Sequence, residues 1–326
     1  MYLPELKFSL WADFIERAYL DGEFKELIDK KIINGATSNP AIFKSAFLTS
    51  SAYKEQLATL QGCSAKEKYE ALAIFDIQKA ADILKPLYDS GDDGYVSIEV
   101  DPFLCDNAKA TIDEAKRLYS AIGRENVMIK IPATSAGYIA METLSGLGIA
   151  INATLIFSEK QAMACAEAFA KGAKVAPQIA ATVISVFVSR IDRALDSLLI
   201  EKGITPALTG VYNSALIYGK VEHMQVPKCR TLFASTGVKG DGLPAHYYVD
   251  ALLGLNSINT APIDTIKAFD TNGKKVQSLP LDAKIIAEHF MKIKESGIDF
   301  DAVIQKQIED GLEAFKEAFQ EIMEAL

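Results

Sequence analysis

The sequence of 326 residues predicts an α/β fold, a (β/α)8 (TIM) barrel with additional helices. Short stretches rich in β-branched residues alternate with longer helical patterns from one end of the chain to the other. Eight such strands occur within about 250 residues, and this number and spacing fit a closed parallel barrel better than an open sheet.

The predicted strands lie at residues 7–13, 31–36, 94–101, 126–132, 149–156, 182–188, 230–235 and 256–261. The helical patterns between them include residues 106–121, which open with Asp106 as a cap, and residues 158–171, which open with Ser158. Residues 44–93 are long enough for two or three helices, which we interpret as an insertion on the barrel.

The last predicted helix, at about residues 300–326, carries one apolar stripe at spacings of three and four. Its members are Ile304, Ile308, Leu312, Phe315, Phe319, Ile322 and Leu326. The sequence leaves open whether this stripe packs across the barrel or against a partner subunit of a homo-oligomer. No linker rich in proline, glycine or serine divides the chain, so we expect a single domain over residues 1–326.

Composition limits the classes of partner and cofactor. The chain has 34 basic and 43 acidic residues, a formal net charge of −9, which argues against a general nucleic-acid binder. An anionic small substrate would then need positive charge concentrated in one place. The cysteines and the three histidines (His223, His246 and His289) lack metal-ligand spacing, and no glycine-rich nucleotide loop occurs. We expect no metal, no disulfide framework and no cofactor.

The N-terminal segment carries Glu5, Lys7 and Asp13 and so lacks the apolar core of a signal peptide. No run reaches the roughly 18 apolar residues of a membrane span. We therefore expect a cytoplasmic protein that does not bind a membrane.

Several predicted strands carry polar residues on one side, although both faces of a parallel barrel strand are usually apolar. In residues 149–156, for example, Ile151, Ala153 and Leu155 alternate with Asn152 and Thr154. One such strand could be an exposed edge, but five or six cannot all be edges. We expect the polar sides to converge on the barrel axis near the carboxyl ends of the strands, where barrel enzymes carry their sites.

Lys130, in "ENVMIKIPAT" at residues 125–134, belongs to this polar set. Desolvation of a lysine favours its neutral amine, which can attack a carbonyl and form a Schiff base. The protonated imine is an electron sink, so a nearby carboxylate that removes a hydroxyl proton can break a carbon–carbon bond. The alternative is a structural ion pair of Lys130 with Glu99 or Asp13, which would leave the surrounding hydroxyls and amides without a purpose.

The sequence resembles the transaldolase family over most of its length. The resemblance is carried, in the family's order, by "LWADFIER", "NGATSNPAIF", "VSIEVDP", "MIKIPAT", "INATLIFS", "SVFVSRID" and "LFASTG". It implies transfer of a three-carbon dihydroxyacetone unit from a ketose phosphate to an aldose phosphate, in the pentose phosphate pathway. The short run "TSNP" alone is weak, since Asn39 and Pro40 are also typical of an ordinary helix start.

The resemblance also implies a role for each matching residue. Lys130 would form the Schiff base, Asp13 would be the acid/base for the sugar hydroxyl, and Glu99 and Thr154 would hold the water that moves protons during imine formation. The residues expected to bind the transferred unit or to line the pocket are Thr37, Asn39, Asn152, Ser185 and Phe187.

Phosphate binding would fall to Arg190 and Ser235. The best-known branch of the family has an arginine two residues after this serine, whereas this chain has Gly237 there and Lys239 two residues further on. Lys239 could bind phosphate as a point charge. It could equally be an exposed loop lysine.

Two other functions remain as alternatives. An aldolase of the same superfamily would release the three-carbon unit; by resemblance, the fructose 6-phosphate aldolase branch has tyrosine at the place of Phe187 and glutamine at the place of Glu99. A barrel without activity could bind sugar phosphates, but it gives no reason to keep a buried amine with two carboxylates.

Overall fold

The computed structural model describes residues 1–240 and 242–326. Within these residues the strands form a closed barrel in which each strand pairs in parallel with the next and β8 pairs with β1. The strands are β1 (Ser9–Ala12), β2 (Gly35–Thr37), β3 (Tyr95–Glu99), β4 (Val127–Pro132), β5 (Ile151–Ile156), β6 (Thr182–Phe187), β7 (Cys229–Ala234) and β8 (Ile258–Ala261). The predicted (β/α)8 barrel is confirmed.

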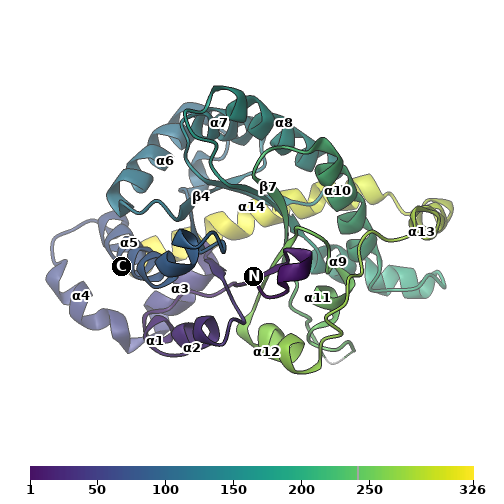
Figure 1. Ribbon diagram of the computed structural model, residues 1–326, viewed down its shortest axis with the longest axis horizontal. Helices are drawn as coiled ribbons and strands as arrows, with labels where there is room; N and C mark the ends of the chain where they lie inside the picture. The colour runs from purple at the N-terminus through teal and green to yellow at the C-terminus, as the bar shows by residue number, and fades with distance from the viewer. Residues whose placement is uncertain (241) are drawn as a thin grey trace.

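Helices surround the strands (Figure 1). They are α1 (Arg17–Asp21), α2 (Glu23–Asp29), α3 (Pro40–Thr49), α4 (Lys54–Thr59), α5 (Ala65–Asp89), α6 (Ala108–Ile122), α7 (Ser135–Gly146), α8 (Glu159–Val175), α9 (Ser189–Glu201), α10 (Thr209–Met224), α11 (Tyr247–Ala251), α12 (Ile263–Asn272), α13 (Ala283–Glu295) and α14 (Phe300–Ala325). Short 3-10 turns are η1 (Pro4–Leu6), η2 (Ser51–Tyr53) and η3 (Pro102–Leu104). Among the described residues, no helix combines the length and apolar character needed to cross a membrane.

Helix α14 crosses the carboxyl end of the barrel (Figure 1, yellow). It packs against α3, α5, α9, β5 and η3. Its predicted stripe turns inward, since Ile304, Phe315, Phe319 and Ile322 are buried. The sequence left open whether this stripe packs across the barrel or against a partner subunit. In the structure it packs on the barrel of its own chain.

The apolar sides of the strands face the helices, as the alternation predicts. Ile129 and Ile131 of β4 and Val186 of β6 belong to one buried cluster with helix residues such as Leu144 of α7 and Phe169 of α8. Burial of this layer is the main source of stability of such a barrel. It leaves the opposite sides of the strands to fill the barrel interior.

Leu155 is an exception, and its predicted place on the apolar outer side is wrong. The residue has φ of 58°, and the pairing register of β5 with β6 shifts between Ala153 and Ile156. The extra residue of this bulge reverses the alternation. Ile156 therefore takes the outer side, and Leu155 joins the inner cluster with Phe157.

The starts of strand β2 and helix α6 also differ from prediction. Strand β2 begins at Gly35 instead of residue 31, because Lys31 has φ of 58° and closes the turn after α2 with a hydrogen bond to Ile28 O. Helix α6 is capped by Asn107, whose side chain accepts from Ala110 N, and not by Asp106. Ser158 caps α8 as predicted, in a capping box with Gln161.

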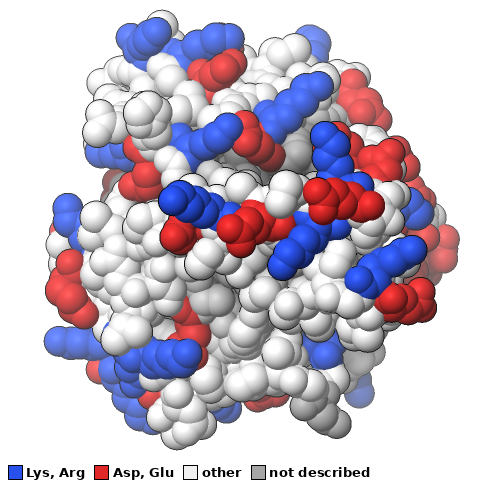
Figure 2. Space-filling model, turned by 90° about the vertical axis from the view of Figure 1, so that its right-hand side faces the viewer, with Lys and Arg blue, Asp and Glu red and all other residues white. Residues whose placement is uncertain are grey.

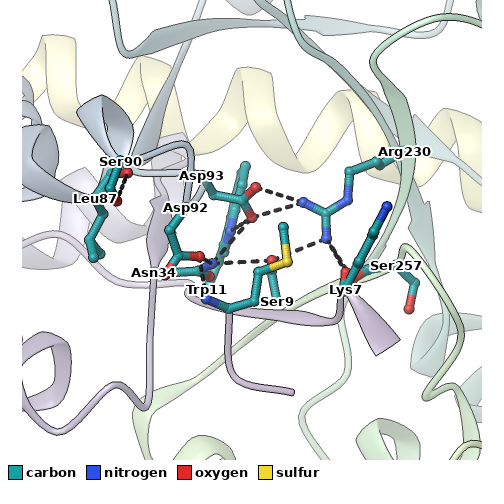
Figure 3. Close-up of polar contacts among 11 residues, drawn as sticks. Lys7, Ser9, Trp11, Asn34, Leu87, Ser90, Asp92, Asp93, Arg230 and Ser257 are labelled. Atoms are coloured by element: carbon teal, nitrogen blue, oxygen red, sulfur yellow. Dashed lines mark hydrogen bonds and ion pairs between the residues drawn. The ribbon is translucent and has the colours of Figure 1, made fainter. Parts of the chain in front are cut away.

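A partly buried ion pair lies at the amino end of the barrel (Figure 3). Arg230 Nη1 lies 2.7 and 2.9 Å from the two carboxylate oxygens of Asp93, and Trp11 Nε1 donates to Asp93 Oδ2 at 3.1 Å. The indole fills the barrel so closely that a Cβ on Gly35 would come within 2.5 Å of it. Trp11 therefore fills the barrel axis next to Gly35.

Candidate active site

A cavity of about 190 Å3 lies at the carboxyl end of the barrel, below α14. We call it the mouth cavity. Its lining residues are Asp13, Thr37, Asn39, Ala41, Lys130, Ser185, Phe187, Arg190, Ala234, Ser235, Thr260, Ala314 and Phe315. Two larger hollows lie on the outer surface, and no residue of a barrel strand lines either of them. The mouth cavity is therefore the one that meets the predicted polar set.

Lys130 is 5% exposed and projects from the middle of β4 into this cavity. Its Nζ donates to the carbonyl oxygen of Ser38 at 3.0 Å and lies 6.0 Å from the ring centre of Phe315. The nearest carboxylate oxygen, Glu99 Oε2, is 4.0 Å away, which is at the limit of an ion pair and too long for a hydrogen bond. The amine is therefore held in place without being bound tightly by a carboxylate.

Glu99 pairs with Lys130 in the register of β3 and β4. Both of its carboxyl oxygens are buried and have no hydrogen-bond partner among the described residues, and the same holds for Thr154 Oγ1. Burial raises the pKa of Glu99 to about 8; the ammonium of Lys130 opposes this rise and the charge of Asp13 adds to it. Unpartnered polar atoms of this kind are the usual places for a bound water.

Asp13 follows β1 and is tied to β8 by its backbone N–H, which donates to Ala261 O at 2.9 Å. Thr37 Oγ1 donates to Asp13 Oδ1 at 2.7 Å and lies 2.6 Å from Thr260 Oγ1. Because the Thr37 proton goes to the carboxylate, Thr260 must donate to Thr37. A chain of two hydroxyls thus fixes the orientation of this carboxylate.

The predicted amide and hydroxyl groups fall into two sets. Asn152 lies below the cavity, where its Nδ2 donates to Ser97 Oγ at 3.0 Å and its Oδ1 accepts from Ser185 Oγ at 2.7 Å. Asn39 lines the cavity, but its Oδ1 caps α3 by accepting from Ile42 N at 3.0 Å. The helix-cap interpretation of this asparagine is correct, and its Nδ2 is the group that it can offer to a ligand.

Arg190, the second residue of α9, contributes positive charge to the lining of the cavity. Its guanidinium carbon lies 5.2 Å from the ring centre of Phe187. Burial lowers the pKa of Arg190 from its ordinary value, the charge of Arg193 adds to this, and Asp13 and Asp310 oppose it. Ser235 lines the same region with φ of 55°, and its Oγ is 3.1 Å from Ser189 Oγ. This end of the cavity suits an anionic group.

Lys239 is apart from this group. Its side chain is exposed and is not among the residues that line the mouth cavity. Charge is mixed on the outer face in Figure 2, where lysine and arginine alternate with aspartate and glutamate.

None of the three histidines lines the cavity, and within the described residues no group of three His, Cys, Asp or Glu side chains could hold a metal ion.

Sequence reasoning missed Thr260, the Ser38 carbonyl and Phe315 as parts of this site. Thr260 shares its side of the predicted strand with Ile258, and Asn259 lies on the other side, so this strand shows no clear alternation. A backbone carbonyl gives no signal in the sequence. Phe315 was counted only as part of an apolar stripe, which does not reveal that one of its rings covers a lysine.

Comparisons with known proteins agree with the geometry. The family model described as Transaldolase/Fructose-6-phosphate aldolase matches residues 10–326. A curated protein named transaldolase from Campylobacter jejuni subsp. doylei is 47% identical over 331 aligned residues, which cover 98% of this chain and 99% of that protein. One of the same name from Helicobacter pylori (strain P12) is 42% identical and is covered over 99% of its length.

Proposed function

We propose that this chain, which belongs to the Transaldolase/Fructose-6-phosphate aldolase family, transfers a dihydroxyacetone unit from a ketose phosphate to an aldose phosphate through a Schiff base on Lys130. Fructose 6-phosphate and sedoheptulose 7-phosphate are the expected donors, and erythrose 4-phosphate and glyceraldehyde 3-phosphate the expected acceptors. The observation that carries the proposal is a buried lysine, 4.0 Å from Glu99, in the same cavity as Asp13.

In the first step, the neutral amine of Lys130 attacks the ketone carbon of the donor. The resulting carbinolamine loses water: one proton comes from the nitrogen and one from Glu99, and the product is a protonated imine beside a carboxylate. A pKa of about 8 leaves Glu99 protonated near neutral pH, so it can donate this proton. A water between Glu99 and Thr154 would carry it to the departing oxygen.

In the second step, Asp13 removes the proton of the hydroxyl on the donor carbon that becomes the aldehyde. The bonding electrons move into the iminium, an aldehyde phosphate leaves, and an enamine stays on Lys130. The acceptor aldehyde then reacts with the enamine in the reverse sense, and water releases the product ketose phosphate. Thr37 orients Asp13 for both proton transfers, and its own hydrogen bond to that carboxylate supports this role.

Substrate binding is divided between the two ends of the cavity. Arg190 and Ser235 would hold the phosphate, as their place at the anion-compatible end supports. Asn39 and Ser185 would bind the hydroxyls of the transferred unit, with Asn152 behind Ser185. The apolar ring of Phe187 would help to keep water from the enamine until an acceptor arrives.

The test is borohydride trapping with fructose 6-phosphate followed by peptide mass mapping. We expect a reduced three-carbon adduct on Lys130 and none in Lys130→Met. Label on another lysine, or no label in the unmodified chain, would refute the Schiff-base proposal.

A second measurement separates transfer from release, because the name of the family covers both activities. Product should form from fructose 6-phosphate only when erythrose 4-phosphate is supplied. Free dihydroxyacetone formed steadily without an acceptor would favour the aldolase instead. The cytoplasmic location and the homo-oligomer considered from the sequence stay predictions.

A further inference from the structure

Glu99 is not among the residues that line the mouth cavity. It lines a second cavity, between the carboxyl end of β3 and helices α5, α6 and α14. We call this the rear cavity. Its volume of about 10 Å3 is close to the minimum that one water molecule needs.

The walls of the rear cavity combine polar groups with apolar ones. Tyr69 and Ala73 come from α5, Leu118 from α6 and Phe319 from α14. Tyr69 lines the cavity together with Glu99, and burial, followed by the charge of Glu99, raises the pKa of its phenol. A water in the cavity would meet partners that can both donate and accept hydrogen bonds.

An ion network forms the outer end of the rear cavity. Lys66 Nζ lies 2.8 Å from Asp101 Oδ2 and 3.4 Å from Glu114 Oε1, and Arg117 joins Glu114 to Glu70. The Lys66 side chain is 41% exposed, whereas that of Glu99 is 3% exposed. The network therefore extends from solvent to the wall of the cavity behind the buried carboxyl.

The chemistry of the mouth requires a place for one water molecule. Imine formation breaks the carbinolamine carbon–oxygen bond and releases one water; hydrolysis of the product imine consumes one. In the proposed reaction a sugar phosphate would occupy the mouth cavity during both steps, and Phe315 of α14 is part of the lining of that cavity. The released water forms next to Glu99, which has both carboxyl oxygens free of protein partners.

We propose that the rear cavity is the port through which this water leaves and returns, between Glu99 on the inside and the ion pair of Lys66 with Asp101 on the outside. The inference rests on the proposed Schiff-base function. It assigns to Ala73 and Leu118 the role of keeping room for the water, and to Tyr69 that of a hydrogen-bond partner along the path.

Ala73→Val tests the port because it fills the cavity without changing a charge. Ala80→Val is the matched control, since Ala80 is also fully buried on α5 but does not line the cavity. Each variant receives fructose 6-phosphate labelled with oxygen-18 at the ketone, without an acceptor. The measured quantity is the loss of label per imine formed, with imine counted by borohydride quenching and corrected for exchange without enzyme.

We expect the unmodified chain and Ala80→Val to lose the label in nearly every imine cycle. In Ala73→Val the trapped water should return to the same carbon, so that label loss per cycle falls about tenfold, equivalent to ~1.4 kcal/mol of added barrier to escape. If Ala73→Val does not fold, Leu118→Phe narrows the same cavity from α6 and repeats the test. Unchanged loss per cycle in the folded variant means that water leaves by the mouth and overturns the inference.

The two proposals fail in different ways. Absence of any borohydride adduct in the unmodified chain refutes the Schiff base itself. Normal adduct formation with label loss in Ala73→Val equal to that in Ala80→Val refutes only the port.

Discussion

Nζ of Lys130 lies 4.0 Å from Oε2 of Glu99, yet no described residue gives the carboxyl oxygens of Glu99 a hydrogen bond. Burial raises the pKa of Glu99 from 4.5 to about 8, against the opposing charge of Lys130. The folded state therefore keeps a proton that the unfolded state loses. Such a group lowers stability progressively as pH rises through the window between the two pKa values.

Glu99→Gln should remove this pH-dependent cost. The two proteins should be similar in stability near pH 4, and the variant should become the more stable one between pH 4.5 and 8, by up to about 5 kcal/mol. Urea unfolding at pH 4, 6 and 9 measures the difference. The exposed Glu309→Gln is the control and should show no such trend. A difference that stays constant with pH would contradict the raised pKa.

Asp13→Asn should separate imine formation from bond cleavage. Thr37 Oγ1 donates to Asp13 Oδ1 at 2.7 Å, so an amide can keep this contact while losing the ability to remove a proton. Loss of a general base costs about 10²- to 10⁴-fold in rate. Borohydride should then trap the uncleaved six-carbon adduct on Lys130. A three-carbon adduct formed at the unmodified rate would assign the base to another residue.

Most of the barrel followed from the sequence because period-2 alternation is a local property. For this reason the sequence predicted correctly which sides of β3, β4 and β6 face the helices. Leu155 was not, because a bulge with positive φ is set by packing against neighbouring elements and leaves no local signal. The start of β2 was predicted wrongly for a similar reason, since Lys31 adopts φ of 58° and a lysine gives no local signal for this conformation.

The site shows the same division between local and tertiary information. Residues at the carboxyl ends of strands, such as Lys130 and Asp13, could be indicated because alternation and strand order bring them to one end of the barrel. The position of α14 over the mouth depends on contacts between distant parts of the chain. For that reason Phe315 and the rear cavity could be found only in the structure.

We expect Arg190 and Lys239 to contribute differently to phosphate binding. Arg190 lines the mouth cavity, whereas the Lys239 side chain is exposed outside it. Because hydrogen bonds to charged groups contribute about 1.5–3 kcal/mol, Arg190→Met should raise the KM for fructose 6-phosphate by roughly 10- to 100-fold. Lys239→Met should change it by no more than about twofold. The opposite order of effects would place the phosphate beside Lys239.

Phe187→Tyr should increase release of dihydroxyacetone in the absence of an acceptor. The ring of Phe187 lines the mouth cavity without offering a donor. A phenol there can hold a water and help to protonate the enamine carbon. Hydrolysis of the resulting imine then releases dihydroxyacetone, as in an aldolase. Phe187→Leu is the control, because it also changes the ring but adds no hydroxyl. Equal release from both variants would mean that loss of packing, and not the hydroxyl, admits water.

Asp93→Asn should weaken the fold without affecting chemistry at the mouth. The variant keeps the shape of the side chain but leaves the partly buried guanidinium of Arg230 without its counter-charge. Because hydrogen bonds to charged groups contribute about 1.5–3 kcal/mol, we expect a loss of stability in this range. Urea unfolding should detect this loss, while kcat at a temperature well below unfolding should stay within about twofold, because the pair lies at the amino ends of the strands and substrates bind at the carboxyl ends.

Asp82→Asn is the matched control for that experiment, since Asp82 pairs with Arg124 on the outer surface. Its cost should stay below about 1 kcal/mol, as for other exposed ion pairs. A large fall in kcat for Asp93→Asn would mean that the amino end of the barrel positions the mouth, through the hydrogen bond of Trp11 to Asp93. Equal stability losses in the two variants would show that burial does not strengthen the dependence of Arg230 on its partner.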